Sequence, residues 1–121
     1  MPVSRISENA LRKLVKESID EKSTCVIKFY SNGCEYCHNL QDYYEEISDT
    51  YKEENIHFFA FNVEDATDLD SLIKINGVPS IAAVSTGGAH SRVRILEDPD
   101  PPNKHTWYFS KDIKNFIDRE K

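Results

Sequence analysis

The spacing of hydrophobic positions changes several times along this chain, and each change marks the boundary of an element. Residues 24–30 form a nearly continuous run of β-branched, apolar and aromatic residues, which predicts a buried strand. Further strands are predicted at 56–63 and at 78–84, where Pro79 stands at the start because a missing N–H donor is tolerated there. A Gly-Gly turn then predicts a hairpin into a fourth strand at 92–96.

Apolar residues at helical spacing predict four helices around these strands. The first runs to about residue 20, the second ends near residues 51–54, and the third stops at Gly77. We expect Ser7 to cap the first helix, Asp65 or Thr67 to cap the third, and Ser110 to cap the fourth, while the second begins at Cys34. This order predicts an α/β fold with a central mixed sheet of about four strands and helices on both faces.

Composition and charge narrow the class of protein. At 121 residues, of which 39% are apolar, the chain is long enough for one domain with its own core. The net charge of −6 argues against nucleic acid or an anionic membrane as a partner, and no apolar run approaches the roughly 18 residues of a membrane span. The first ten residues contain no signal-peptide core, so we expect a cytoplasmic protein, monomeric and without a membrane partner.

Two of the three cysteines, Cys34 and Cys37, stand where the first strand ends and the second helix begins, after a turn at 31–33. The free N–H groups and the positive dipole end of a helix N-terminus favour the thiolate, the nucleophilic form of cysteine. We therefore expect Cys34 to attack a substrate disulfide and Cys37, one turn later, to resolve the mixed disulfide. A Cys-x-x-Cys pair at this place in a βαβ unit is typical of thioredoxin-like redox proteins.

Two segments carry a resemblance to the thioredoxin family, most closely to the single thioredoxin domains of protein disulfide isomerases. Residues 26–37 (Val-Ile-Lys-Phe-Tyr-Ser-Asn-Gly-Cys-Glu-Tyr-Cys) are similar to its strand and active-site segment. Residues 77–80 (Gly-Val-Pro-Ser), about 45 residues beyond the first cysteine, are similar to its cis-proline loop. The likeness covers roughly 7–120, apart from 97–105, a proline-rich loop that we interpret as an insertion without regular structure.

The resemblance implies a site and a set of partners. The Val78–Pro79 bond should be cis and lie opposite the first cysteine, and the backbone beside it should pair with an extended substrate segment. The expected substrate contacts are Gly33, Tyr36, Val78 and Pro79. The redox-active disulfide implies no bound cofactor and no metal. The partners would be protein disulfides or dithiols, together with a reductase or an oxidase.

Three features depart from the family pattern. Gly33 stands where the family usually has tryptophan, so a flat apolar contact surface is lost. Between the cysteines stand Glu35 and Tyr36, and Glu35 places a negative charge that disfavours the thiolates and makes the pair more reducing. Lys28 stands where the family keeps a buried carboxylate thought to move protons for the second cysteine. A protonated lysine cannot accept a proton, but it stabilises a nearby thiolate.

Several side chains keep two interpretations. Tyr36 is either a substrate contact or an ordinary exposed aromatic residue. His38, on the same helix face as the first cysteine of the pair, either tunes the thiolate or is a partly exposed helix residue. Lys28 is either a buried base or a side chain that reaches outward to solvent. We expect Cys25 to be an inert core thiol, and Trp107 to lie too far along the chain from the cysteine pair to report on it.

Other functions stay open. A glutathione-dependent, glutaredoxin-like enzyme is suggested by Tyr36, by Val78-Pro79 and by the Gly-Gly turn, although the acidic pair that usually follows those glycines is absent. A non-catalytic interaction module is suggested by the missing tryptophan, by Lys28 and by the proline-rich loop. Residues 34–38 also match a haem-attachment motif, but the preceding strand and the lack of any methionine beyond Met1 argue against haem. A zinc site would need further ligands at matching spacing.

Overall fold

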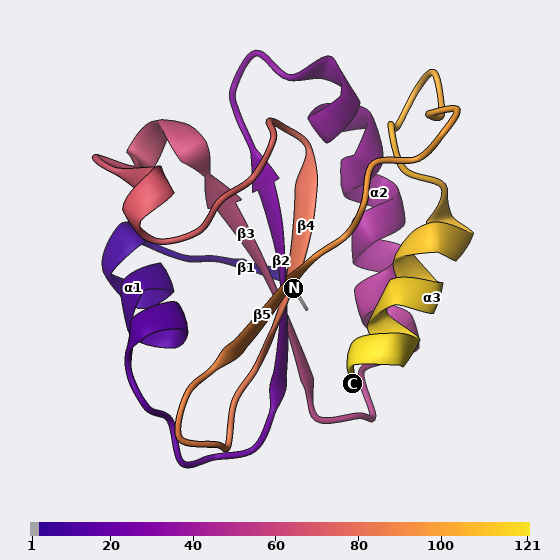
Figure 1. Ribbon diagram of the computed structural model, residues 1–121. Helices are drawn as coiled ribbons and strands as arrows, with labels where there is room; N and C mark the ends of the chain where they lie inside the picture. The colour runs from indigo at the N-terminus through magenta and orange to yellow at the C-terminus, as the bar shows by residue number, and fades with distance from the viewer. Residues whose placement is uncertain (1–2) are drawn as a thin grey trace.

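The fold is a five-stranded mixed sheet between two layers of helices. A computed structural model describes residues 3–121 (Figure 1); Met1 and Pro2, which open the segment without a signal-peptide core, lie outside the described residues. The strands have the spatial order β1-β3-β2-β4-β5. Their bounds are β1 (Val3–Arg5), β2 (Thr24–Tyr30), β3 (Ile56–Asn62), β4 (Ser80–Ser85) and β5 (Arg92–Ile95). β1 and β2 pair parallel with β3, whereas β4 pairs antiparallel with β2 and with β5.

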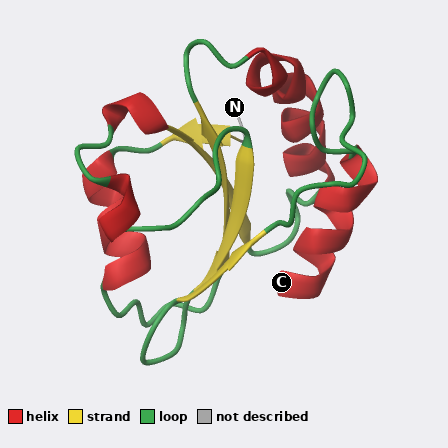
Figure 2. Cartoon of the chain, turned by 45° about the horizontal axis from the view of Figure 1, so that its top comes forward, coloured by secondary structure: helices red, strands yellow, loops and turns green. Residues whose placement is uncertain are grey.

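Helices cover both faces of the sheet, which confirms the predicted fold class. α1 (Glu8–Lys16) lies against one face, and α2 (Glu35–Thr50) and α3 (Ser110–Glu120) lie together against the other (Figures 1 and 2). The sheet has five strands rather than about four, because β1 was not predicted. Its three residues are half-buried or exposed, so a short edge strand of this kind leaves no hydrophobic alternation in the sequence.

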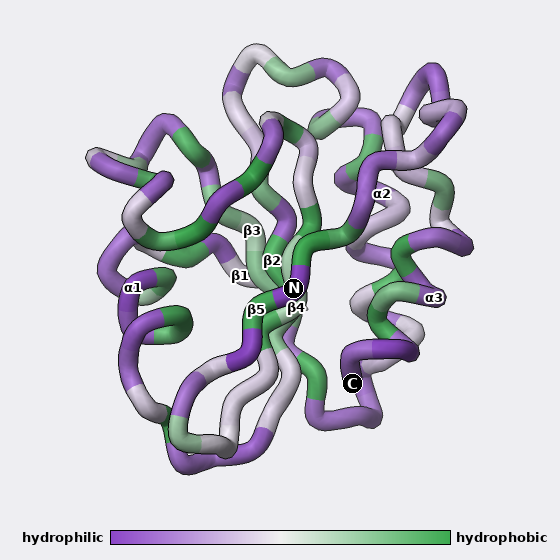
Figure 3. The backbone as a smooth tube through the Cα atoms, in the orientation of Figure 1, coloured by the Kyte–Doolittle hydropathy of each residue, from purple (hydrophilic) through white to green (hydrophobic). Residues whose placement is uncertain are grey.

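Alternation along the central strand β2 divides the core into two clusters, one on each face. Cys25, Ile27 and Phe29 face the α1 layer, where Leu11 is also fully buried. Val26 faces the α2–α3 layer, which contributes most of the second cluster. Figure 3 shows the hydrophobic segments concentrated on the strands, between the helical layers. Cys25 is 5% exposed and free, as predicted for a core thiol, and its burial raises its pKa.

The predicted third helix is wrong. The segment instead forms two 3-10 turns, η1 (Val63–Asp65) and η2 (Leu69–Ser71). Ala66 between them is extended, and the Thr67 N–H donates to the Glu8 carboxylate at 2.7 Å instead of starting a helix. The apolar residues Leu72 and Ile73 are buried in the core cluster on the α1 face of the sheet, and they do not form the stripe of a helix.

The ends of the other helices also differ from prediction. Ser7 caps α1 as expected, since its Oγ accepts from the Ala10 N–H at 3.1 Å, but the helix ends at Lys16 rather than near residue 20, because Glu17 turns extended. Ser110 is the first residue of α3 and not its cap; the cap is Phe109, which makes no side-chain capping bond. None of the helices in residues 3–121 is long and apolar enough to cross a membrane.

The hairpin between β4 and β5 forms as predicted. Gly87 has φ +102°, and its N–H donates to the Ile19 carbonyl at 3.0 Å. A Cβ atom at this position would lie 2.8 Å from the Lys22 Cα, so only glycine fits the turn. Beyond β5, residues 96–109 lead to α3, and we call them the β5–α3 connection. Their only regular pairing is an isolated bridge between Asn103 and Trp107, so the 97–105 segment is irregular as predicted.

Candidate redox site

Cys34 and Cys37 form a disulfide at the first turn of α2. Their Cα atoms are 5.2 Å apart, within the ordinary range for a disulfide. Cys34 is the N-cap of α2, and its Sγ accepts a hydrogen bond from the Cys37 N–H at 3.0 Å. After reduction this N–H, which has no carbonyl partner within the helix, would stabilise a thiolate on Cys34. Cys34 is half-buried whereas Cys37 is 2% exposed, so Cys34 is the more accessible cysteine of the pair.

The turn before Cys34 is fixed by side chains from the last residue of β3 and from η1, which follows it. The Asn32 N–H donates to Glu64 Oε2 at 2.6 Å, and the Asn62 amide donates to Asn32 Oδ1 at 2.9 Å. Asn62 and Glu64 were not predicted as part of the site, because nothing in their local sequence shows that the ends of β2 and β3 meet. The parallel register, which pairs Tyr30 with Asn62, brings them together.

His38 and Glu35 lie on the exposed side of the first helical turn. The His38 Nε2 lies 2.9 Å from the Asn32 carbonyl, to which it must donate because a carbonyl only accepts. The ring therefore also holds the turn before Cys34. Among residues 3–121, Glu35 makes no ion pair. Tuning of the thiols by either residue stays a prediction.

The Val78–Pro79 bond is cis, as the resemblance implies. In the antiparallel pairing of β2 and β4, Phe29 is the partner of Ser80, so Pro79 lies one step further toward the turn that carries Cys34. Figure 1 shows the segment before β4 and the start of α2 at the same end of the sheet. The Pro79 carbonyl accepts a long hydrogen bond, 3.5 Å, from the Tyr108 hydroxyl. Burial raises the pKa of Tyr108 to about 12, so this hydroxyl stays a donor at neutral pH.

Lys28 is buried in a hollow that Cys37 also lines, so of its two interpretations the one in which it reaches outward to solvent is wrong. It is 6% exposed and lines a hollow of about 350 Å³ together with Cys37 and Tyr44. Its Nζ lies 5.3 Å from the ring centroid of Tyr44 and 5.7 Å from that of Tyr30. Burial lowers the pKa of Lys28, and the Glu45 carboxylate opposes this shift.

Tyr36 and Trp107 form an aromatic pair beside the disulfide. Their ring centroids are 5.6 Å apart in an edge-to-face arrangement at 62°, and Tyr36 is 37% exposed. The expectation about Trp107 relied on its distance along the chain, whereas in the fold its ring packs against the residue between the two cysteines. The β5–α3 connection folds back on the start of α2, where the Asn39 amide donates to the His105 carbonyl at 2.8 Å.

The backbone conformation at Gly33 does not require glycine. Its φ is not in the left-handed region, and a Cβ atom there would meet no other atom within 4 Å. The position leaves open space beside the disulfide. Within residues 3–121, no group of three or more histidine, cysteine or acidic side chains is placed to hold a metal ion.

A strand, a cysteine pair at the following helix N-terminus and a cis-proline at the same end of the sheet define a thioredoxin-like redox site. The Thioredoxin family model matches residues 3–99, and the chain belongs to the thioredoxin family. The matched region ends inside the β5–α3 connection, so Trp107 lies beyond it. A comparison with curated proteins finds no match.

Solved thioredoxin-type structures share the fold at low sequence identity. The J-Trx1 fragment of ERdj5 has a TM-score of 0.70 and 17% identity over 98% of this chain, which spans only 49% of that fragment. The Malassezia sympodialis thioredoxin Mala s 13 has a TM-score of 0.69 and 16% identity over 99% of this chain and 94% of its own. Chloroplastic thioredoxin z has a TM-score of 0.68 and 17% identity over 98% of this chain and 94% of its own. Family and disulfide together support a protein of the thiol–disulfide oxidoreductase kind.

Proposed function

We propose that the protein catalyses thiol–disulfide exchange between its Cys34–Cys37 pair and protein substrates. The observation that carries the proposal is the asymmetry of the pair: the accessible Cys34 sulfur accepts a helix N–H, while Cys37 is buried behind it. The cis-proline at the same end of the sheet supports a site for an extended polypeptide. The substrate class, a redox partner and a cytoplasmic location are parts of this proposal.

The exchange proceeds in two balanced steps. The Cys34 thiolate attacks one sulfur of a substrate disulfide; the substrate S–S bond breaks, and one substrate cysteine leaves as a thiolate that takes up a proton. The Cys37 thiolate then attacks the Cys34 sulfur, releases the second substrate cysteine and forms the Cys34–Cys37 disulfide. Two electrons pass to the substrate, and the reverse sequence oxidises a substrate dithiol.

The test uses three variants, in each of which one cysteine is replaced, and a disulfide-bonded protein substrate. Cys34→Ser should abolish exchange, whereas Cys37→Ser should accumulate a mixed disulfide, visible as a shifted band on a non-reducing gel. Cys25→Ala, which changes only the buried core thiol, is the matched control and should keep the parent rate. Equal activity of Cys34→Ser and the parent protein would refute the proposal.

The direction of electron flow follows from the reduction potential of the pair. After equilibration in glutathione buffers and alkylation, a midpoint near about −270 mV would indicate a reductase, and one near about −180 mV an oxidant or isomerase. The same assays run with and without glutathione separate this function from the glutaredoxin-like alternative, because activity that requires glutathione favours the latter. If Cys34 and Cys37 form no disulfide across this range, the interaction-module alternative takes the place of the proposed enzyme.

A further inference from the structure

Trp107 has a backbone conformation that L-residues rarely adopt. Its φ is +65°, and it is the one non-glycine residue with positive φ in residues 3–121. A conformation of this kind costs energy and persists only where surrounding contacts determine it. Such outliers gather at functional sites, so the contacts that hold Trp107 indicate what its position achieves.

A compact hydrogen-bond network determines this conformation. Trp107 and Asn103 exchange backbone hydrogen bonds at 3.0 and 2.9 Å. The Asn103 side-chain oxygen accepts from the N–H groups of His105 and Thr106 at 2.9 and 3.2 Å. The Thr106 hydroxyl donates to the Tyr108 carbonyl at 2.8 Å. The turn is therefore built from its own side chains and keeps Trp107 in one orientation.

This network orients the indole ring of Trp107 toward the cysteine pair. The Trp107 Nε1–H donates to Asp98 Oδ1 at 3.2 Å, and the ring packs edge-to-face on Tyr36, which stands between the two cysteines. The next residue, Tyr108, donates to the carbonyl of the cis-proline Pro79. The β5–α3 connection thus contacts both parts of the site, the Cys-x-x-Cys turn and the cis-proline. Figure 1 shows the connection rising beside the N-terminal end of α2.

We propose that Tyr36 and Trp107 together bind an aromatic side chain of the polypeptide substrate, next to the cysteine that Cys34 attacks. This inference rests on the proposed function. A polypeptide with its sulfur at Cys34 has this pair as its neighbour, because Tyr36 stands between the two cysteines, is 37% exposed and packs on Trp107. Tyrosine and tryptophan offer large, rigid contact area with little loss of conformational freedom, which suits a contact that selects substrates. The pair makes Trp107 a specificity-determining residue.

Two matched peptides test the pair. Each carries one cysteine as a mixed disulfide with thionitrobenzoate, and they differ only in a phenylalanine or a serine beside that cysteine. The Cys37→Ser protein, with Cys34 reduced, attacks the peptide sulfur; the protein–peptide disulfide forms and thionitrobenzoate, the lower-pKa leaving group, is released and measured by absorbance. We expect the phenylalanine peptide to react about tenfold faster than the serine peptide.

Variants then locate the preference. In the same Cys37→Ser protein, Trp107→Ala and Tyr36→Ala should each reduce the ratio of the phenylalanine rate to the serine rate from about ten to a value of about 1–2. Trp107→Phe should keep most of the preference for the phenylalanine peptide. Tyr43→Ala is the matched control: Tyr43 is 46% exposed on the same helix, about 10 Å further along its axis, and should leave the ratio unchanged. Because Trp107 is the only tryptophan of the chain, its emission should also change when the phenylalanine peptide binds.

The outcomes separate this inference from the proposed function. Equal rates for the two peptides, or a ratio that survives both Trp107→Ala and Tyr36→Ala, would overturn the aromatic contact while exchange at Cys34 stands. Absence of thionitrobenzoate release from either peptide would overturn the proposed function and the aromatic contact with it. The use of both Trp107→Ala and Tyr36→Ala covers the case in which one of them disturbs the connection.

Discussion

Lys28 is a buried cation that lines the same hollow as Cys37, and Glu45, the one anion in the described part of the chain that acts on its charge, forms no ion pair with it. In residues 3–121 no carboxylate lies within ion-pair distance of its Nζ. It shares a hollow with Cys37, and the register across three parallel strands places Arg5, Ala60 and Lys28 in one row. A positive charge in a poorly solvated place stabilises a thiolate nearby, and so stabilises the reduced form of the pair relative to the disulfide.

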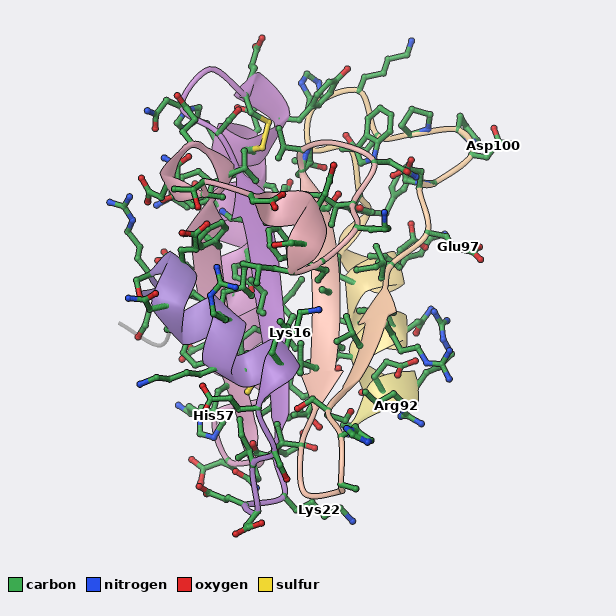
Figure 4. All side chains as sticks on the ribbon, turned by 60° about the vertical axis from the view of Figure 1, so that its left-hand side comes forward. Lys16, Lys22, His57, Arg92, Glu97 and Asp100 are labelled. Carbon is green, nitrogen blue, oxygen red and sulfur yellow. A yellow bond between two sulfur atoms is a disulfide. The ribbon has the colours of Figure 1, made fainter. Side chains whose placement is uncertain are left out.

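Replacing this charge should therefore make the pair more reducing. For Lys28→Met, which keeps an unbranched side chain of similar length, we expect the reduction potential at pH 7 to fall by about 15–30 mV, since 30 mV corresponds to about 1.4 kcal/mol for two electrons. Alkylation after equilibration in glutathione buffers measures the shift. Lys16→Met is the control, because Lys16 lies on α1, away from the disulfide (Figure 4). A shift common to both variants, or none in Lys28→Met, would contradict a role for Lys28.

At the scale of single residues, sequence reasoning located the cysteine pair and the cis-proline but not the residues around them. Cys34, Cys37 and Pro79 were predictable because local spacing and a short motif encode them. Trp107 was not, because its closeness to Tyr36 depends on how the whole β5–α3 connection folds back on α2. Asn62 is a similar case, since its contact with the turn before Cys34 depends on strand register. The site was therefore predicted where it is local and missed where distant segments build it.

At the scale of elements, the hairpin between β4 and β5 allows a sharp test of backbone conformation. Gly87→Ala would place a methyl group 2.8 Å from the Lys22 Cα at a φ of +102°, and we expect it to destabilise the protein by about 2 kcal/mol. Gly88→Ala is the matched control, because its Cβ would meet only the His90 carbonyl at 3.6 Å; its effect should stay within about 0.5 kcal/mol. Urea unfolding followed by Trp107 emission measures both. Similar midpoints for the two variants would contradict the requirement for glycine at this turn.

Elements were predictable in proportion to the strength of their periodicity. α2 was predicted because its apolar stripe extends over four turns, with Leu40, Tyr44 and Ile47 all buried. The segment after β3 has an equally apolar composition, but side-chain contacts such as that between Glu8 and Thr67 hold it as two separate turns. β1 is three residues long and pairs only with β3, so its existence depends on a partner that lies far along the chain.

At the scale of the whole molecule, one carboxylate on each face of the sheet forms a hydrogen bond that links a helix to a segment distant in sequence. On one face, Glu8 of α1 accepts from the Thr67 N–H at 2.7 Å, and this hydrogen bond lowers the pKa of Glu8. On the other, Asp118 of α3 accepts from the Tyr51 hydroxyl at 2.7 Å, which lowers the pKa of Asp118, with Lys121 adding to the effect. Both contacts join segments that are far apart in sequence, and both are stronger with the ionised carboxylate than with the protonated acid.

These two hydrogen bonds predict how the stability of the folded protein depends on pH. A carboxyl group whose pKa is lower in the folded than in the unfolded state contributes stability that is complete above the unfolded pKa, about 4, and is lost as the pH falls through the folded pKa. Acidification below pH 4 should therefore lower the urea midpoint of the parent protein. Asp118→Asn and Glu8→Gln should have lower midpoints at pH 7 but a smaller decrease between pH 7 and pH 3.

The control for this dependence is Asp42→Asn, the same chemical change at an exposed aspartate of α2 that makes no ion pair in residues 3–121. It should reproduce both the parent midpoint at pH 7 and the parent decrease at pH 3. If Asp118→Asn and Glu8→Gln decrease as steeply as Asp42→Asn, acid unfolding arises from other groups. A smaller decrease in both would mean that each layer of helices depends on its own carboxylate, and that acid below pH 4 destabilises the α1 layer as well as the α2–α3 layer that carries the cysteine pair.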